Sequence, residues 1–217
     1  MQIELNDVEV RVLGALVEKE ITTPEYYPLT MNALINACNQ KSNREPVVNY
    51  DAATVNDALN SLKEKYLVSI VMGGDSRVPK YRNYFAETFE LTPQEVAVMD
   101  VLMLRGPQTL GELRTRTERL YKFDSTDDIE VVLQGLEERT AGQFVIKLPR
   151  QPGHKESRYA HLLSGEPVIT VSDEESGSAE SLTKSERIQR LEDEVALLRQ
   201  QFDDLMKEFH EFRDEFK

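Results

Sequence analysis

The sequence contains few of the residues that build metal centres and disulfides, and it has no long hydrophobic run. It has one cysteine and three histidines among 217 residues. One cysteine cannot form an internal disulfide, so we expect a reducing, cytoplasmic environment. These scattered ligands cannot close a zinc site. No apolar stretch approaches the roughly 20 residues that cross a bilayer, and the first residues do not resemble a signal peptide. We therefore expect neither a bound metal nor a membrane partner.

The sequence signatures of the common enzyme classes are also absent. Gly73-Gly74 is followed by neither a Lys-Ser/Thr pair nor a helix start, so it is not a phosphate-binding loop. No nucleophile motif appears. We expect no enzymatic activity and no cofactor. The formal net charge of -13 argues against non-specific polyanion binding by the whole molecule, but it leaves room for a local basic surface.

A helix–loop–helix pattern at residues 29–62 predicts the centre of a first domain. Each of its two helices carries apolar residues at i, i+3, i+4 and i+7, namely Met31, Leu34, Ile35 and Cys38, then Val55, Ala58, Leu59 and Leu62. An earlier helix begins at the N-cap Asn6 with Glu9 as its capping-box partner. Alternation after the second helix predicts strands at 66–72 and 81–85. Three helices and a β-hairpin predict a winged helix over residues 1–88.

The same order recurs downstream as an internal repeat of roughly eighty residues. Thr92, Pro93 and Glu95 form a strong helix start. Two further apolar helical patterns follow, and strands are predicted at 144–148 and 158–163. We therefore predict a second winged helix over residues 89–171. The expected fold class is mainly α with small β-hairpins (α+β), as two tandem winged-helix domains followed by a C-terminal coiled-coil helix.

The C-terminal part of the sequence changes character twice. Residues 172–182 have no apolar period and predict an acidic flexible linker. Residues 183–217 then carry an unbroken heptad repeat of apolar residues: Ile188, Leu191, Val195, Leu198, Phe202, Leu205, Phe209, Phe212 and Phe216. The flanking charges, such as Glu194 and Arg199, pair with opposite sign in a parallel register. We expect a parallel coiled-coil homodimer, the alternative being one helix folded back onto the body.

Long strings of this sequence resemble those of a known family. YPLTMNALINACNQKSNREPV, GELRTRTERLYKF and PGHKESRYAHLL resemble segments of the YceH-like bacterial proteins, a family of uncharacterised function. The resemblance covers residues 1–167 closely and the tail more loosely. It implies a tandem winged-helix fold in a bacterial cytoplasm. It supplies no reaction and no ligand, so the function has to be inferred from the residues themselves.

The first predicted domain carries a candidate DNA-binding surface. In a winged helix the third helix enters the major groove and the wing contacts the backbone. Asparagines can read adenine edges, and cations on the loop and wing can bind phosphates. The candidate residues are Lys41, Arg44, Thr54, Asn56, Asn60, Arg77, Lys80 and Arg82. The alternative is that these are ordinary solvated residues.

The second predicted domain has a different charge pattern. Its third helix carries carboxylates such as Asp127 and Asp128, which repel phosphate. Positive charge collects instead on the second helix and the wing, in a secondary basic patch of Arg114, Arg116, Arg119, Lys122, Arg150, Lys155 and Arg158. We expect this patch to bind a charged protein surface or the edge of a nucleic acid.

The polar loop at residues 36–46 allows two interpretations. Its amides and hydroxyls can bond their own backbone, which is a structural role, or the loop can bind a ligand or partner. The leading hypothesis for the whole chain is a dimeric DNA-binding or transcription-associated regulator that contacts DNA mainly through its first domain. The alternative is a scaffold whose winged helices hold a protein partner without binding DNA.

Overall fold

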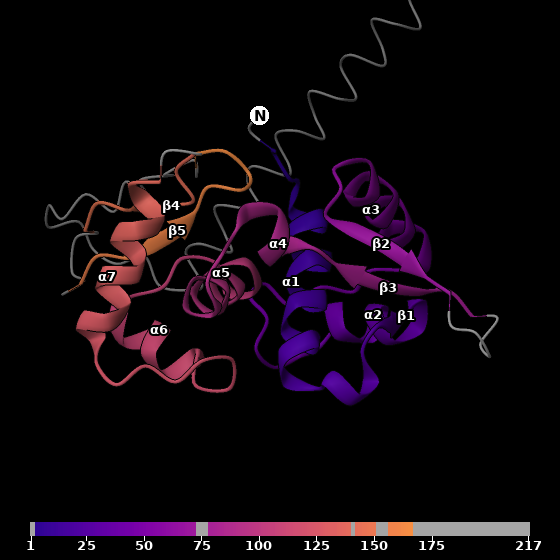
Figure 1. Cartoon of the computed structure of the whole chain (residues 1–217), viewed down its shortest axis with the longest axis horizontal. Coiled ribbons are helices and arrows are strands. Elements are labelled where there is room, and N and C mark those ends of the chain that lie inside the picture. The colour runs from indigo at the N-terminus through magenta and orange to yellow at the C-terminus, as the bar shows by residue number, and fades with distance from the viewer. Residues whose placement is uncertain (1–2, 73–77, 140–141, 151–155, 167–217) are drawn as a thin grey trace, which may run out of the picture. The chain divides into compact units, whose positions relative to one another are not determined.

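The computed structural model describes residues 3–72, 78–139, 142–150 and 156–166 (Figure 1). These residues belong to one compact unit, residues 1–170, that is mainly helical with two small antiparallel sheets. The predicted linker at 172–182 and the predicted coiled-coil helix at 183–217 lie outside the described residues. Within the described ranges, no helix combines the length and apolar character needed to span a membrane.

The first half follows the predicted order of three helices and a hairpin. Its elements are α1 (Asp7–Thr22), the short 3-10 helix η1 (Pro24–Tyr26), β1 (Leu29–Thr30), α2 (Met31–Cys38), α3 (Ala52–Glu64), β2 (Val68–Val71) and β3 (Lys80–Asn83). The three strands form an antiparallel sheet in the order β1-β3-β2. The predicted capping box is confirmed, because the Glu9 N–H donates to Asn6 Oδ1 over 2.9 Å and the Asn6 N–H donates to Glu9 Oε2 over 2.7 Å.

Both strands of the first hairpin are shorter than the sequence predicted. Tyr66 has a positive φ of 59° and is 83% exposed, so it belongs to the turn that leaves α3 rather than to β2. At the other end β3 stops at Asn83, because the buried Phe85 begins a short helix, α4 (Phe85–Phe89). Five residues are too few for a helical period to show in the sequence, which explains why α4 was not predicted.

The second half repeats the element order of the first. Its elements are α5 (Pro93–Arg105), α6 (Leu110–Arg116), α7 (Thr126–Glu137), β4 (Val145–Lys147) and β5 (Tyr159–His161), the two strands pairing antiparallel. The predicted helix start is confirmed, since Thr92 and Glu95 form a capping box with Pro93 in the first turn. Both strands are again shorter than the predicted 144–148 and 158–163.

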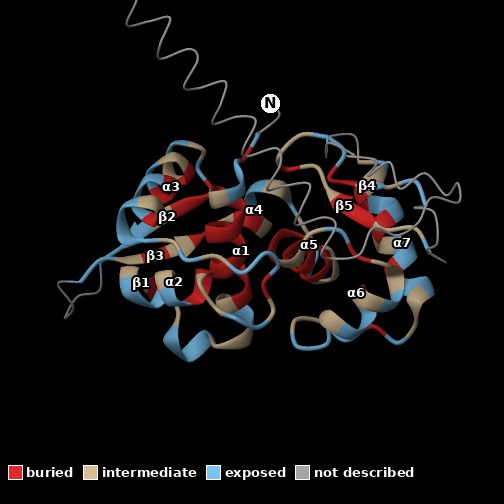
Figure 2. Cartoon of the chain, turned by 180° about the vertical axis from the view of Figure 1, so that it is seen from behind, coloured by how far each residue is buried: buried red, intermediate tan, exposed pale blue. Residues whose placement is uncertain are grey.

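The two halves share one hydrophobic core, with α1 and α5 packed against each other at its centre. All residues of α1 from 9 to 18 are buried, and Figure 2 shows the buried residues gathered along these two helices. A Cβ added to Gly14 would lie 3.0 Å from Leu104 Cδ2 and 3.3 Å from Met103 Cβ. The absent side chain at Gly14 therefore allows α1 and α5 to approach closely.

An aromatic contact joins the halves a second time. Phe89 of α4 packs edge-on against Phe85 at 5.4 Å between ring centroids and against Phe144 at 5.1 Å. Arg139 Nη1 donates to the Phe89 carbonyl over 2.7 Å. The segment between the two repeats is thus fixed to the second half by packing and by hydrogen bonds.

Candidate functional site

Helix α3 carries the amide side chains of the candidate surface. Val55, Leu59 and Leu62 are fully buried and hold one face of the helix against the core. Asn56 and Asn60, which lie one turn apart, are both exposed on the other face, and Thr54 is half-buried. Asp51 caps the helix by accepting from the Thr54 N–H over 2.8 Å. The predicted position of these polar groups on an exposed helical face agrees with the structure.

The cations of the first hairpin lie on β3, the middle strand of the sheet, between β1 and β2 (Figure 1). Lys80 is half-buried. Arg82 contacts the ring of Tyr84 at 5.2 Å and pairs with Glu87 over 3.1 Å, the two charged side chains being 42% and 53% exposed. Such an exposed ion pair contributes little stability, so Glu87 can be exchanged for another anion. Arg77 lies outside the described residues.

The structure contradicts the placement of Arg44 on this surface. Lys41 is exposed as predicted, but the Arg44 side chain is fully buried. Its guanidinium donates to Glu18 over 2.6 and 3.1 Å and to the Ala37 carbonyl over 3.1 Å. The physical reason is that Glu18, in the buried stretch of α1, needs a cationic partner. Arg44 is therefore a structural residue.

The rest of the polar loop also has structural contacts. The Glu45 N–H donates to the Leu104 carbonyl of α5 over 2.9 Å, and Arg11 Nη2 donates to the Pro46 carbonyl over 2.8 Å. Asn39 exchanges two hydrogen bonds of 2.8 Å with the backbone of Tyr50. These contacts support the structural interpretation of the loop. Cys38 is buried at its start, and burial raises the pKa of its thiol to about 12, so it is not a reactive thiolate.

The secondary basic patch is divided between two environments. Arg114, Arg119, Lys122 and Arg150 are exposed, and Lys155 lies outside the described residues. Arg116 and Arg158 instead share the carboxylate of Glu112, at 3.7 and 2.8 Å. Neutralisation by Glu112 makes Arg158, the closer of the two at 2.8 Å, a weaker phosphate ligand than the sequence implied, while Arg116 at 3.7 Å is less affected.

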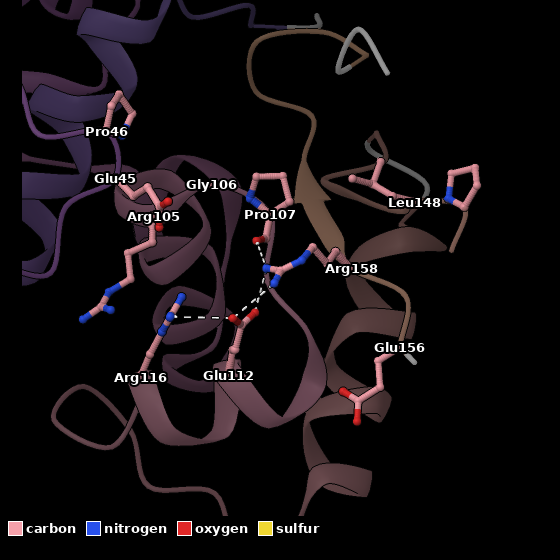
Figure 3. A pocket seen from close by; sticks show the side chains of 11 residues that line it. Glu45, Pro46, Arg105, Gly106, Pro107, Glu112, Arg116, Leu148, Glu156 and Arg158 are labelled. Carbon is pink, nitrogen blue, oxygen red and sulfur yellow. Dashed lines mark hydrogen bonds and ion pairs between the residues drawn. The ribbon is translucent and has the colours of Figure 1, made fainter. Parts of the chain in front are cut away.

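Arg116 and Arg158 lie in a hollow of about 530 Å³ between the polar loop, the end of α5 and the second hairpin. Figure 3 shows the Glu112 carboxylate between these two arginines, with Arg105 at the edge of the hollow. Glu45 and Glu156 also line it. Acidic and basic side chains alternate around this hollow, so it has no strong preference for an anion.

The acidic character of α7 agrees with the sequence analysis. Asp127, Asp128 and Glu130 are exposed, and Asp128 forms a capping box with Ser125. Carboxylates at the N-terminus of a helix stabilise its dipole. They also leave α7 with a surface that repels phosphate.

Comparison with known proteins places the chain in a family. Residues 5–154 match the family model described as a protein of unknown function, DUF480. The chain belongs to the DUF480 family. A UPF0502 protein of Geobacter sulfurreducens is 50% identical over 221 residues, which cover 100% of both chains. A UPF0502 protein of Solibacter usitatus is 51% identical over 209 residues, covering 96% of this chain and 100% of the relative. These matches confirm the resemblance to the uncharacterised YceH-like bacterial proteins.

Two structural features of this DUF480 protein were not recognised in the sequence. The first is an exposed apolar strip on the first hairpin: Ile70 is 42% exposed, Met72 64% and Val78 53%. The second is Asp100, which is only 1% exposed within α5. A single carboxylate inside the apolar run VAVMDVLML was the available signal for Asp100. In the described part of the chain, no group of His, Cys, Asp and Glu side chains is arranged to hold a metal.

Proposed function

We propose that this DUF480 protein is a dimeric tandem winged-helix regulator that binds duplex DNA mainly through its first half. The order α1, α2, α3 and the hairpin β2–β3 is that of a winged helix. In DNA-binding members of that fold, the third helix enters the major groove and the hairpin contacts the backbone. The second half has the same order of elements, but its acidic α7 makes it the supporting or docking copy.

The observation that carries the proposal is the exposed amide face of α3. Asn56 and Asn60 lie one turn apart, so both side chains reach from the same face of the helix. An asparagine can form a bidentate pair with adenine in the major groove. The buried Leu59 and Leu62 hold the opposite face rigidly, which is what positioning two amides on base edges requires.

Cations on the loop and on the hairpin of the first half supply the phosphate contacts. Lys41 is exposed, and Lys80 and Arg82 lie on the hairpin strand β3. Because the Arg82–Glu87 pair is exposed, a DNA phosphate can replace Glu87 with little loss of stability. The overall charge of -13 repels DNA elsewhere on the molecule, so binding depends on these few phosphate contacts and should weaken steeply with salt.

The C-terminal heptad repeat supplies the dimeric part of the proposal. A parallel coiled coil of residues 183–217 would present two copies of α3 to two half-sites, as two-fold dimers do. Sedimentation of the full chain and of residues 1–166 tests this part by itself. A monomeric full chain would remove the dimer from the proposal without affecting the DNA contact.

Binding to DNA across a salt series tests the proposed function. The full chain is passed over genomic fragments at increasing salt, beside a Lys80→Ala/Arg82→Ala variant. We expect retention to weaken steeply with salt, and the double variant to lower the slope of log affinity against log salt by about 2, one for each lost phosphate contact. Gln143→Ala, an exposed residue of the second half, is the control and should bind like wild type.

The apolar strip on the first hairpin supports a second candidate, a scaffold that binds a protein partner. Ile70, Met72 and Val78 expose apolar area where a DNA-contacting wing usually carries cations. The net acidity of the chain also suits a protein partner better than DNA. Absence of retention on DNA even at low salt would favour this candidate over the regulator.

A further inference from the structure

A second hollow, of about 400 Å³, lies between α1, α5 and α6 and has a buried carboxyl group in its lining. Glu18 and Thr22 of α1 and Asn43 of the polar loop line one side, and Asp100 and Arg105 of α5 line another. The hollow is therefore built by both halves of the described unit. Its volume is within the range of about 300–1,000 Å³ that is typical of small-molecule sites.

Asp100 lacks the hydrogen bonds that a buried carboxyl needs. It is 1% exposed, and its Oδ1 has no hydrogen-bond partner among the described residues. Burial raises the pKa of the Asp100 carboxyl well above its ordinary value, and the charge of Glu18 adds to the shift against the opposing effect of Arg44 and Lys19. A neutral carboxyl group both donates and accepts a hydrogen bond. A polar group in the hollow would therefore satisfy Asp100.

The hollow is lined by three arginines, Arg105, Arg116 and Arg119, and by three acids, Glu18, Asp100 and Glu118. The arginines favour an anion, because two of the acids are already compensated. Glu18 is already paired with Arg44 at 2.6 Å and with Lys19 at 3.2 Å. Arg105 and Arg119 have no carboxylate partner within 4.0 Å among the described residues, and Arg116 contacts Glu112 only at 3.7 Å. The neutral partners of Arg105 and Arg116 are the side-chain oxygens of Asn43 and Gln108, which accept from them. Burial lowers the pKa of Arg105, and the positive charges of Arg116 and Arg44 lower it further. Two neighbouring guanidinium groups that repel each other are stabilised by an anion placed between them.

We propose that this hollow binds a small phosphorylated metabolite. Arg105 and Arg116 bind the phosphoryl group through their planar forks, and Arg119 adds a third positive charge at the exposed edge. A hydroxyl group of the ligand hydrogen-bonds to Asp100. Arg105 and Arg116 also line the neighbouring hollow of about 530 Å³, but there Glu112 pairs with Arg116 and Arg158, and none of the described residues that line it has a buried carboxyl oxygen without a partner. The proposal is independent of whether the protein binds DNA.

The binding test uses the full-length protein and three probes at matched ionic strength: inorganic phosphate, ribose 5-phosphate and unphosphorylated ribose. Isothermal calorimetry and thermal melts are recorded against chloride alone. We expect millimolar inorganic phosphate to raise the melting temperature, ribose 5-phosphate to bind more tightly, and ribose to have no effect. If neither phosphate probe binds beyond the chloride control, the proposal is overturned and Asp100 is satisfied by ordered water alone.

Variants then locate the binding site. Arg105→Met should weaken binding of both phosphate probes by about tenfold or more, since a charge-assisted hydrogen bond is lost, and Arg116→Met should do the same. Asp100→Leu should leave inorganic phosphate binding intact and abolish the advantage of ribose 5-phosphate. Lys147→Met removes an exposed cation of β4 that does not line the hollow, and it should bind like wild type. If Lys147→Met and Arg105→Met weaken phosphate binding equally, and both variants are folded by circular dichroism, then loss of any positive charge has the same effect. That result would refute the site.

Discussion

Arg44 and Glu18 form a buried ion pair with two hydrogen bonds, from Nη2 to Oε2 over 2.6 Å and from Nη1 to Oε1 over 3.1 Å. The pair joins the polar loop to α1 close to where α1 packs on α5. Arg44 also donates through Nη1 to the Asn43 carbonyl over 2.9 Å, and Asn43 in turn accepts from Arg105 of α5. The loop is thus a structural connection between the two halves of the described unit.

Removal of Arg44 alone should destabilise the protein strongly. Arg44→Met leaves the Glu18 carboxylate, 12% exposed, without its main partner, and breaking a buried pair from one side costs about 3–5 kcal/mol. Urea denaturation measures this loss. The double variant Arg44→Met/Glu18→Leu should recover most of it, because no unpaired charge remains. A single variant within about 0.5 kcal/mol of wild type would show that the pair is not structural.

Gly14→Ala should lower the free energy of unfolding although alanine is the better helix former. The new Cβ would lie 3.0 Å from Leu104 Cδ2, and such overpacking costs about 1–3 kcal/mol. Gly135→Ala in α7 is the matched control, since a Cβ there meets nothing within 4 Å. That control should stabilise by up to about 1 kcal/mol. Stabilisation by both substitutions would refute the close approach of α1 and α5.

Asp100 should make stability fall as the pH rises. The raised pKa of its buried carboxyl means that the folded state keeps a proton which the unfolded chain releases above the ordinary value of 3.8. Stability from this group is therefore complete below that pH and is lost toward neutral pH. Asp100→Asn should melt above wild type at pH 7, and the difference should shrink toward pH 4 in thermal melts. A difference that does not change with pH would contradict this account of Asp100.

His161 should make stability fall as the pH decreases, which is opposite to the effect of Asp100. Burial lowers the pKa of this β5 histidine from 6.5 to about 4, and its Nδ1 has no hydrogen-bond partner among the described residues. The unfolded chain therefore binds a proton between these two pH values that the folded chain excludes, and stability falls as the pH decreases through this window. His161→Gln should flatten that part of the profile of melting temperature against pH. An unchanged slope would show that folding does not lower the pKa of His161.

Local signals in the sequence were sufficient to predict several features of the fold. The capping boxes at Asn6–Glu9 and Thr92–Glu95 depend on residues three positions apart, so both helix starts were predictable. The burial of Cys38 followed from its place in a helical period. The family was also recognisable, because long strings of uncommon residues carried the resemblance.

Other features depend on partners distant in the sequence. In the sequence Arg44 resembles an exposed cation of a loop. Its partner Glu18 lies 26 residues away in the chain, on α1, and only the fold brings the two together. Likewise the paired state of Arg158 depends on Glu112, 46 residues away. Periodicity cannot show such pairs, which explains why the pairing of Arg44, Arg116 and Arg158 with carboxylates was not predicted.

Base reading by Asn56 and Asn60 of α3 is the main element of the proposed DNA binding, and a binding comparison tests it most directly. Genomic fragments retained by the full chain are selected, and affinities of wild type and Asn56→Ala/Asn60→Ala are measured on selected and random fragments. We predict that the double variant loses its preference for selected fragments by about tenfold or more, while its affinity for random fragments and its salt dependence stay unchanged. Equal affinity of both proteins for selected fragments, or no binding by wild type at low salt, would contradict this proposal.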